Sequence, residues 1–306
     1  MTISKYLVPV RGAGELPPLF LVHSIAAELS WLSPLANQLP KAQPVYGFSA
    51  PGLNSEAPFF HSLPEMAAAY LHDLRQVQPR GPYRLGGYSF GGTVAFEMAR
   101  QLDEAGECVE LLVLVDAFAP APGLVRTLSR WADDGLLLQV VSNLFGLHWK
   151  SRELLPAGRL PAGDLAAQTE IATRHLLAHC TIPHSFEVLR GYLARCQAVM
   201  RQHAALLAAY RPQPFGPWRN PPLRSVLLHN TRGLIARGSA LRLPELPDDE
   251  RDPPHGWEAW LPTPPERFAI DCEHFMLARD PALGEVARVL QQVLHGDAAS
   301  RPVAAV

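Results

Sequence analysis

Short apolar runs alternate with helical patterns along much of this chain, and this alternation restricts its fold more than any other feature. The mainly apolar runs at residues 19–22, 45–49 and 110–115 have the length of buried strands, and residues 83–88 are a further strand candidate that runs into glycines. Residues 62–78 lie between two such runs and repeat apolar side chains at helical spacing. Strands that alternate with helices in this way predict a mostly parallel sheet covered by helices.

Residues 123–210 interrupt the alternation. They show helical patterns and no strand candidate, whereas strand-like runs resume at 225–228 and 268–270. We therefore predict an α/β core formed by residues 1–122 and 211–306. Residues 123–210 are then a helical insertion that lies over this core as a lid.

Composition and charge exclude several classes of protein. Of the 306 residues, 48% are hydrophobic and 18% are charged, which is too apolar for a disordered chain and too polar for a bundle of membrane helices. No apolar run approaches the ~18 to 20 residues of a spanning helix, and the first residues lack the apolar segment of a signal peptide. With 27 basic and 29 acidic residues, the net charge of −2 offers no attraction to nucleic acid or anionic membranes. We expect a cytoplasmic protein with neither partner.

The cysteines indicate a reduced protein without a metal site. The chain has four of them, Cys108, Cys180, Cys196 and Cys272. They lie far apart, with no C-x-x-C pair and no histidine at zinc-ligand spacing, so we expect buried free thiols and no metal. The 30 prolines cluster at residues 211–222 and 243–254, which we expect to be linkers or long loops.

The sequence Gly87-Tyr88-Ser89-Phe90-Gly91 matches the pattern G-x-S-x-G where a predicted strand runs into a predicted helix. A turn as tight as this strains the serine backbone and tolerates only small neighbours. The same turn exposes the serine Oγ at the N-terminus of a helix, where backbone N–H groups favour negative charge. This context predicts a nucleophilic Ser89, the alternative being a glycine-rich turn with no chemical role.

A serine hydroxyl is a weak nucleophile near neutral pH and needs a base, which in turn needs an acid to orient it. In the α/β-hydrolase fold, the histidine lies on the loop after the last strand. His274 occupies that place, between the apolar run at 268–270 and the final helical pattern. His229, at the end of a strand, and His255, in a proline-rich loop, are poorer candidates for the base.

The acid is expected at Asp116. The strand after the insertion, SVLLHNTRG, ends without a carboxylate, and Asp248, Asp249 and Asp252 lie too far along a loop to hold an imidazole. The strand ELLVLV ends in Asp116, 27 residues after Ser89, at the sheet edge where catalytic groups gather. The alternative is an aspartate that caps a loop.

The oxyanion of a tetrahedral intermediate needs two backbone donors. One is predicted to be the N–H of Phe90, directly after the nucleophile, and the other the N–H of Ile25 or Ala26, in the loop after the first core strand. The sequence alone does not decide between Ile25 and Ala26 as this second donor. His23 and Ser24 are a poor second catalytic pair, because adjacent residues that leave a strand point to opposite sides.

Five motifs in order, PLFLVHS, PVYGFSAPGL, LGGYSFGGTVAFEMA, LVLVDAFAP and CEHFMLARDP, resemble those of the thioesterase domains that end nonribosomal peptide synthetases and polyketide synthases. The resemblance covers nearly all of the core and is weak in the insertion. It implies an α/β-hydrolase fold and release of an acyl or peptidyl chain from the phosphopantetheine arm of an acyl or peptidyl carrier protein. In that family the chain passes to the serine that matches Ser89, with His274 and Asp116 in their matching places, and then to water or an internal nucleophile.

The chain departs from the family pattern in one loop. Relatives commonly show His-Pro-Ala-Gly-Gly where this chain has HSIAA, so the proline and both glycines are absent. The chain starts with its own methionine and a segment that resembles an interdomain linker, which fits either an excised domain or a free-standing enzyme. We expect a monomer with no bound cofactor, since the carrier protein would deliver the substrate.

Three alternatives share parts of this interpretation. A carboxylesterase or lipase would use the same three residues on free esters without a carrier protein. An editing thioesterase would clear short misprimed acyl groups, but its relatives tend to have smaller lids than residues 123–210 provide. A non-catalytic carrier-binding module would keep the fold without the chemistry.

Overall fold

A computed structural model describes residues 5–54, 57–216 and 223–295, and half of the proline-rich stretch at 211–222 therefore lies outside the described residues. Its centre is a seven-stranded sheet in the order β1-β3-β2-β4-β5-β6-β7. All neighbouring strands are parallel except β1, which pairs antiparallel with β3 at one edge. The strands are β1 Leu7–Arg11, β2 Leu19–Val22, β3 Val45–Phe48, β4 Tyr83–Tyr88, β5 Val109–Val115, β6 Arg224–Asn230 and β7 Glu266–Ile270.

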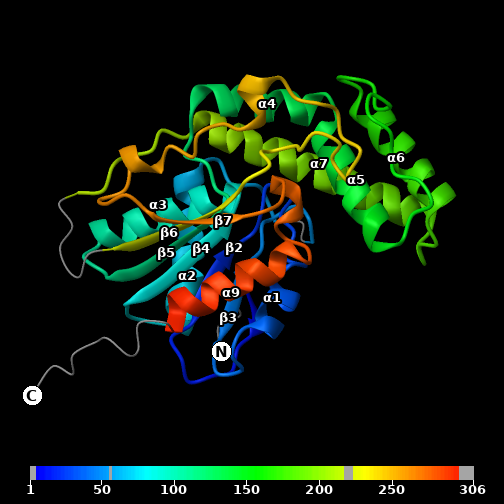
Figure 1. Ribbon diagram of the computed structural model, residues 1–306. Helices are drawn as coiled ribbons and strands as arrows, with labels where there is room; N and C mark the ends of the chain where they lie inside the picture. Colours follow the sequence, from blue (N-terminus) through cyan, green and yellow to red (C-terminus); the bar gives the residue numbers. More distant parts are fainter. Residues whose placement is uncertain (1–4, 55–56, 217–222, 296–306) are drawn as a thin grey trace, which may run out of the picture.

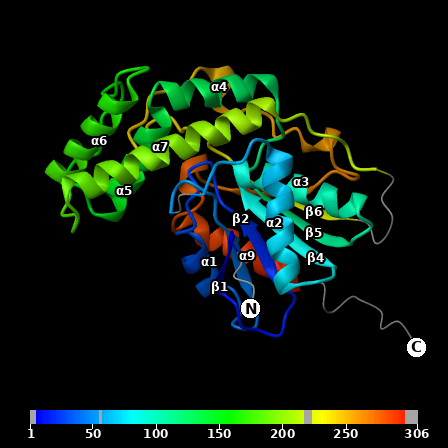
Figure 2. The same ribbon diagram turned by 180° about the vertical axis from the view of Figure 1, so that it is seen from behind.

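Helices cover both faces of the sheet. One face packs against α2 (Leu63–Val77) and α3 (Phe90–Glu104), and the other against α1 (Leu32–Gln38) and α9 (Ala282–His295) (Figures 1 and 2). Successive residues of a strand point to opposite faces, so in β2 the odd-numbered leucines join one core and Phe20 and Val22 the other. Since all four β2 residues are buried, the strand reads as a continuous apolar run. The predicted α/β fold with a mostly parallel sheet is confirmed.

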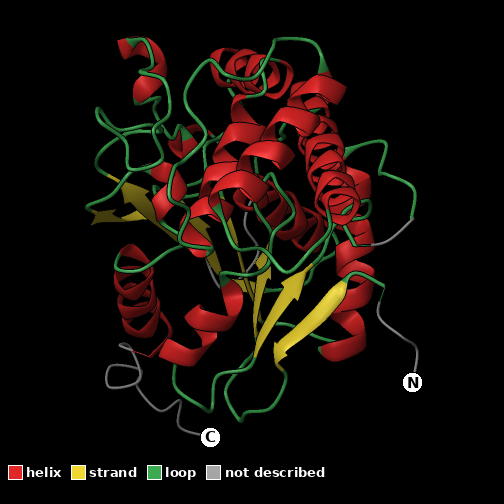
Figure 3. Ribbon diagram, turned by 90° about the vertical axis from the view of Figure 1, so that its right-hand side faces the viewer, coloured by secondary structure: helices red, strands yellow, loops and turns green. Residues whose placement is uncertain are grey.

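Four helices lie between β5 and β6, and the described residues from 123 to 210 contain no strand. They form a helical layer across the carboxyl ends of the strands (Figures 1 and 3). The loop after β6 packs against this layer, since Asn143 donates a hydrogen bond to the Leu241 carbonyl at 2.8 Å. The four helices are α4 Pro122–Asp133, α5 Leu136–His148, α6 Leu165–His179 and α7 Phe186–Ala209.

The helix predicted at 62–78 begins as its sequence indicates. Ser62 is the N-cap, and its side chain accepts a hydrogen bond from the Glu65 amide at 3.2 Å. The Glu65 carboxylate accepts a hydrogen bond from the amide of His61 rather than from that of Ser62. Two elements were not predicted from the sequence. They are β1, an edge strand with an exposed Val8, and α1, which spans only seven residues and contains a proline.

The four cysteines carry free thiols. Cys196 and Cys272 are buried as predicted, but Cys108 and Cys180 are only half-buried, so the prediction of burial was wrong for these two. Within the described ranges, no group of three or more possible ligand side chains could hold a metal ion. No helix of the described chain combines the length and the apolar character that a membrane span requires.

Candidate active site

Ser89 occupies a strained turn between β4 and α3. Its backbone has φ 56° and ψ −120°, a conformation that costs an ordinary residue energy. The turn is tight enough that a Cβ on Gly87 would lie 2.2 Å from backbone atoms of Gly91. The strained backbone and the requirement for small neighbours, both predicted from the G-x-S-x-G pattern, are confirmed.

Gly91 holds the start of α3 against the end of β2, and this contact yields the first prediction. A Cβ at residue 91 would lie 2.3 Å from the carbonyl oxygen of His23 and 2.5 Å from that of Val22. Because neither backbone oxygen can move freely, we expect Gly91→Ala to lower the free energy of unfolding by about 1–3 kcal/mol. The loss is measured by urea unfolding. A matched control is Gly191→Ala, in the second turn of α7, where the nearest atom to the new Cβ is 3.6 Å away. There alanine should stabilise by up to about 1 kcal/mol, and equal stability of the two variants would contradict the packing argument.

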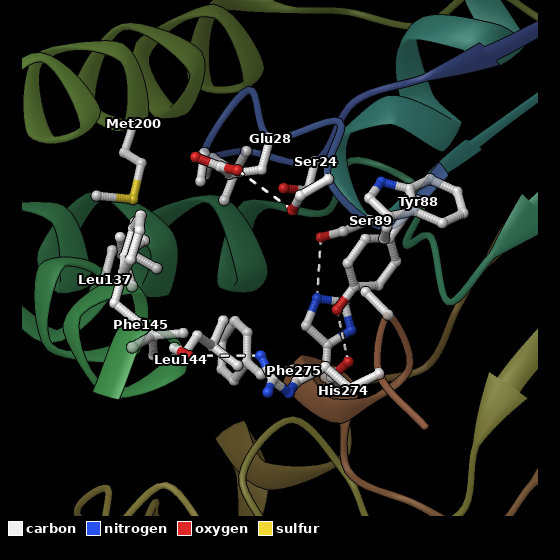
Figure 4. A pocket seen from close by; sticks show the side chains of 18 of the residues that line it. Ser24, Glu28, Tyr88, Ser89, Leu137, Leu144, Phe145, Met200, His274 and Phe275 are labelled. Carbon is white, nitrogen blue, oxygen red and sulfur yellow. Dashed lines mark hydrogen bonds between the residues drawn. The ribbon is translucent and has the colours of Figure 1, made fainter. Parts of the chain in front are cut away.

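The structure brings Ser89, His274 and Asp116 together. The Ser89 Oγ lies 2.9 Å from His274 Nε2, and His274 Nδ1 lies 2.7 Å from Asp116 Oδ2 (the Ser89–His274 pair is drawn in Figure 4). A carboxylate can only accept, so Nδ1 carries the ring proton and Nε2 is free to take the proton of the serine. The backbone of His274 is fixed on both sides, by its amide to the Gly233 carbonyl at 3.0 Å and by the Tyr88 hydroxyl to its own carbonyl at 2.6 Å.

Asp116 is completely buried at the end of β5 and accepts more than the bond from His274. The Asn230 amide donates to Oδ1 at 3.0 Å, and the Asn230 side chain donates to Oδ2 at 2.6 Å. His255 Nε2 also donates to Oδ1, at 3.0 Å. Burial alone would raise the pKa of Asp116, but the hydrogen bonds from His255, His274 and Asn230 outweigh it and hold this pKa well below its ordinary value. The carboxylate therefore stays ionised beside His274.

The role of His255 in the site was missed from the sequence. It was considered there only as a base, whereas the structure places its ring on the far oxygen of Asp116, parallel to Phe118 at 4.5 Å between centroids. The proline-rich loop that carries it has no periodicity from which its position could be read. His229 contacts the His255 ring edge-on at 5.8 Å between centroids, and its Nδ1 lies 3.2 Å from the Asn230 carbonyl oxygen rather than at Asp116.

The residues predicted to bind an oxyanion lie around Ser89. Phe90 is the first residue of α3, and Ile25 and Ala26 are the central residues of a turn closed by the Ala27 amide on the Ser24 carbonyl at 3.0 Å. Neither the Ile25 nor the Ala26 amide donates a hydrogen bond to another described residue. Both amides are therefore free to meet a substrate, and the choice between them stays open.

A cavity of about 260 Å³ opens beside Ser89 and His274. Its opposite wall comes from α5 and α7 and is apolar, with Leu137, Phe145 and Met200 facing the cavity (Figure 4). Glu28 and Arg279 supply charged groups in the lining. A second, smaller cavity also borders Ser89, so this serine lies between two cavities. Apolar walls with few polar groups are typical of small-molecule sites.

Comparison with known proteins identifies relatives of the whole chain. A model of the thioesterase domain family matches residues 17–294. The chain is 30% identical over 285 residues to a dimodular nonribosomal peptide synthase of Bacillus subtilis (strain 168), which is 93% of this chain and 11% of that protein. It is 44% identical over 114 residues to malpibaldin synthetase of Mortierella alpina, which is 37% of this chain and 2% of that protein. The chain thus spans only a small part of these relatives.

Solved structures show the same fold. The NocB thioesterase domain from the nocardicin cluster superposes with a TM-score of 0.61 at 24% identity, covering 95% of this chain and 99% of that one. The four-domain nonribosomal peptide synthetase AB3403 superposes with a TM-score of 0.70 at 20% identity, covering 95% of this chain and 20% of that one. The family model covers the sheet from β2 to β7, the inserted helices, and Ser89, Asp116 and His274. This match confirms the predicted relationship: the chain belongs to the thioesterase domain family.

Proposed function

We propose that this chain releases an acyl or peptidyl chain from the phosphopantetheine arm of a carrier protein, by way of an acyl-enzyme on Ser89. The observation that carries the proposal is the unbroken hydrogen-bonded series Ser89–His274–Asp116 beside an apolar cavity. Membership of the thioesterase domain family and the similarity to a nonribosomal peptide synthase support it.

In the first half-reaction, the Ser89 Oγ attacks the thioester carbonyl carbon and its proton moves to His274 Nε2. The carbonyl oxygen becomes an oxyanion, which the N–H of Phe90 and that of Ile25 or Ala26 stabilise. When the carbonyl re-forms, the C–S bond breaks and the pantetheine sulfur takes the proton from His274. Asp116 stabilises the imidazolium that exists between these two proton transfers.

In the second half-reaction, a water molecule or an internal hydroxyl or amine of the acyl chain attacks the ester on Ser89. His274 accepts the proton of this nucleophile and returns it to the Ser89 Oγ as the ester bond breaks. We propose that residues 123–210 act as a lid whose apolar wall, including Leu137 and Met200, holds the acyl chain. Water access under this lid then decides between hydrolysis and cyclisation.

The carrier protein is the partner that the proposal requires, and it delivers the phosphopantetheine arm with the substrate. The residues proposed for the reaction need no resident cofactor. Ser89, His274 and Asp116 all come from one chain, so a monomer suffices. We place the reaction in the cytoplasm, as expected from the sequence.

A comparison of two substrates tests this proposal. We expect a pantetheine thioester to be turned over faster than an oxyester of the same acyl group, because the thiolate is the better leaving group and the proposed natural substrate is a thioester. Initial rates of acid release measure the difference, with the Ser89→Ala variant as the blank. A strong preference for the oxyester would favour a carboxylesterase or lipase instead. Absence of turnover with both substrates would favour a non-catalytic carrier-binding module.

A further inference from the structure

Two buried histidines lie behind the loop that contains Ile25 and Ala26. His23 ends β2 and places its Nδ1 2.7 Å from the Ser24 carbonyl oxygen. His203 comes from the C-terminal half of α7, 178 residues after Ile25, and places its Nδ1 2.7 Å from the Ile25 carbonyl oxygen. Two consecutive peptide groups of the loop are thus each bound by an imidazole.

These contacts determine which ring nitrogen carries the proton. A carbonyl oxygen can only accept, so Nδ1 of both histidines must donate. Nε2 of His23 must then accept, and it accepts from the Tyr70 hydroxyl, 2.9 Å away, which is closer than that hydroxyl's other acceptor, the Ser49 carbonyl at 3.3 Å. Both rings are almost completely buried, and burial lowers the pKa of His23 to about 4 and that of His203 well below its ordinary value. Both imidazoles are therefore neutral at physiological pH and keep this arrangement of protons.

A hydrogen bond that fixes a carbonyl group also fixes the direction of the N–H in the same peptide unit. In a trans peptide, the N–H points away from the C=O of the same planar unit. The bond from His23 to the Ser24 carbonyl therefore sets the direction of the Ile25 N–H, and the bond from His203 to the Ile25 carbonyl sets the direction of the Ala26 N–H. These two amides are the candidates for the second oxyanion donor.

The same rings also pack against the first donor. The His203 ring lies parallel to Phe90, with 4.4 Å between centroids and 11° between planes. The His23 ring lies parallel to His203 at 5.0 Å and to Phe90 at 5.8 Å. These three nearly parallel rings thus support both backbone segments beside Ser89, the start of α3 at Phe90 and the Ile25–Ala26 loop.

We propose that His203 is a positioning residue that, together with His23, holds the Ile25–Ala26 loop in the orientation needed to bind the oxyanion. The two imidazoles hold the Ser24 and Ile25 carbonyls, each by one hydrogen bond. Because His203 belongs to the inserted helices, the oxyanion loop is bound directly to the proposed lid. This inference rests on the serine acyl transfer proposed above.

Two substitutions at residue 203 separate the hydrogen bond from the packing. His203→Phe keeps a flat ring against Phe90 but leaves the Ile25 carbonyl without its donor. His203→Asn loses the ring but places Nδ2 at the same number of bonds from the backbone as His Nδ1. Gln202→Leu is the matched control, because it removes another bond from α7 to the core, to the Phe60 carbonyl at 2.8 Å, away from the oxyanion loop.

We expect His203→Phe to lower kcat for a pantetheine thioester by about 10- to 100-fold, somewhat less than the loss of an oxyanion donor itself, with KM nearly unchanged. The affinity for a trifluoromethyl ketone, whose adduct with serine places an oxyanion in the same position, should fall by a similar factor. His203→Asn should recover most of both quantities, and Gln202→Leu should match the wild type.

Unchanged kcat in His203→Phe, a change confined to KM, or equal losses in His203→Phe and His203→Asn would each overturn the inference. Circular dichroism confirms that the variants fold, and His203→Leu replaces His203→Phe if the latter does not. If the proposed function is wrong, the wild type itself turns over no thioester, and the inference falls with it. The outcomes above are distinguishable from that case because the wild type is active in them.

Discussion

Replacing Ser89 or His274 by alanine is expected to lower the rate of thioester turnover by about 10⁴-fold or more in each case. Without the Ser89 Oγ no acyl-enzyme forms. Without the imidazole, the hydroxyl 2.9 Å from Nε2 has no group to take its proton. The Ser89→Ala/His274→Ala double variant should be slower than either single variant by only a small factor, because the two residues act as a unit.

Single-turnover kinetics with an acyl-pantetheine measure these losses. Ser142→Ala is a suitable control, because it removes a buried serine hydroxyl that bonds only within its own helix, to the Leu138 carbonyl at 2.7 Å. This variant should keep the wild-type rate. Losses that multiply in the double variant would mean that Ser89 and His274 contribute independently, contrary to the proposed mechanism.

Asp116→Asn is expected to lower the rate by up to about 10⁴-fold while the protein stays folded. Both carboxylate oxygens accept from donors, Oδ1 from the Asn230 amide and His255, and Oδ2 from the Asn230 side chain and His274. An amide has one oxygen and one NH₂, so its NH₂ group must face a donor whichever way it is turned. When the NH₂ group faces His274, the imidazole must accept at Nδ1 and carry its proton on Nε2, where it cannot act as a base for Ser89.

The rate of Asp116→Asn across a range of pH checks this prediction. Asp271→Asn is the control, since that carboxylate is exposed and pairs with Arg232 near the same loop. It should leave the rate unchanged. Near-wild-type turnover in Asp116→Asn would show that another group orients His274 and that the acid is wrongly assigned.

The central strands and the turn that carries Ser89 could be predicted from the sequence because their determinants are local. β2 and β4 were predicted with the bounds that the structure shows, β2 because it is a short apolar run and β4 because it runs into the glycines before Ser89. Ser89 was found from five consecutive residues, and Asp116 from its place after an apolar strand. His274 followed from chain order in a fold whose connections are restricted.

Other parts of the site depend on contacts between residues far apart in the chain. His255 reaches Asp116 from a loop without periodicity, and His203 reaches Ile25 from a helix on which it has the spacing of a core residue. Asn230 ends β6, a strand whose partner and register the sequence does not specify. In each case the side chain acts through a partner more than 100 residues away, so no local pattern could identify it.

Labelling with a fluorophosphonate, followed by peptide mapping in a mass spectrometer, tests the central claim that His274 activates the Ser89 hydroxyl. The probe reacts with a serine only when its hydroxyl is activated as a nucleophile. The account predicts one phosphonylated residue, Ser89, with labelling that is strongly slowed in His274→Ala and absent in Ser89→Ala. Modification of a different residue, or labelling of Ser89 at the same rate without His274, would contradict it.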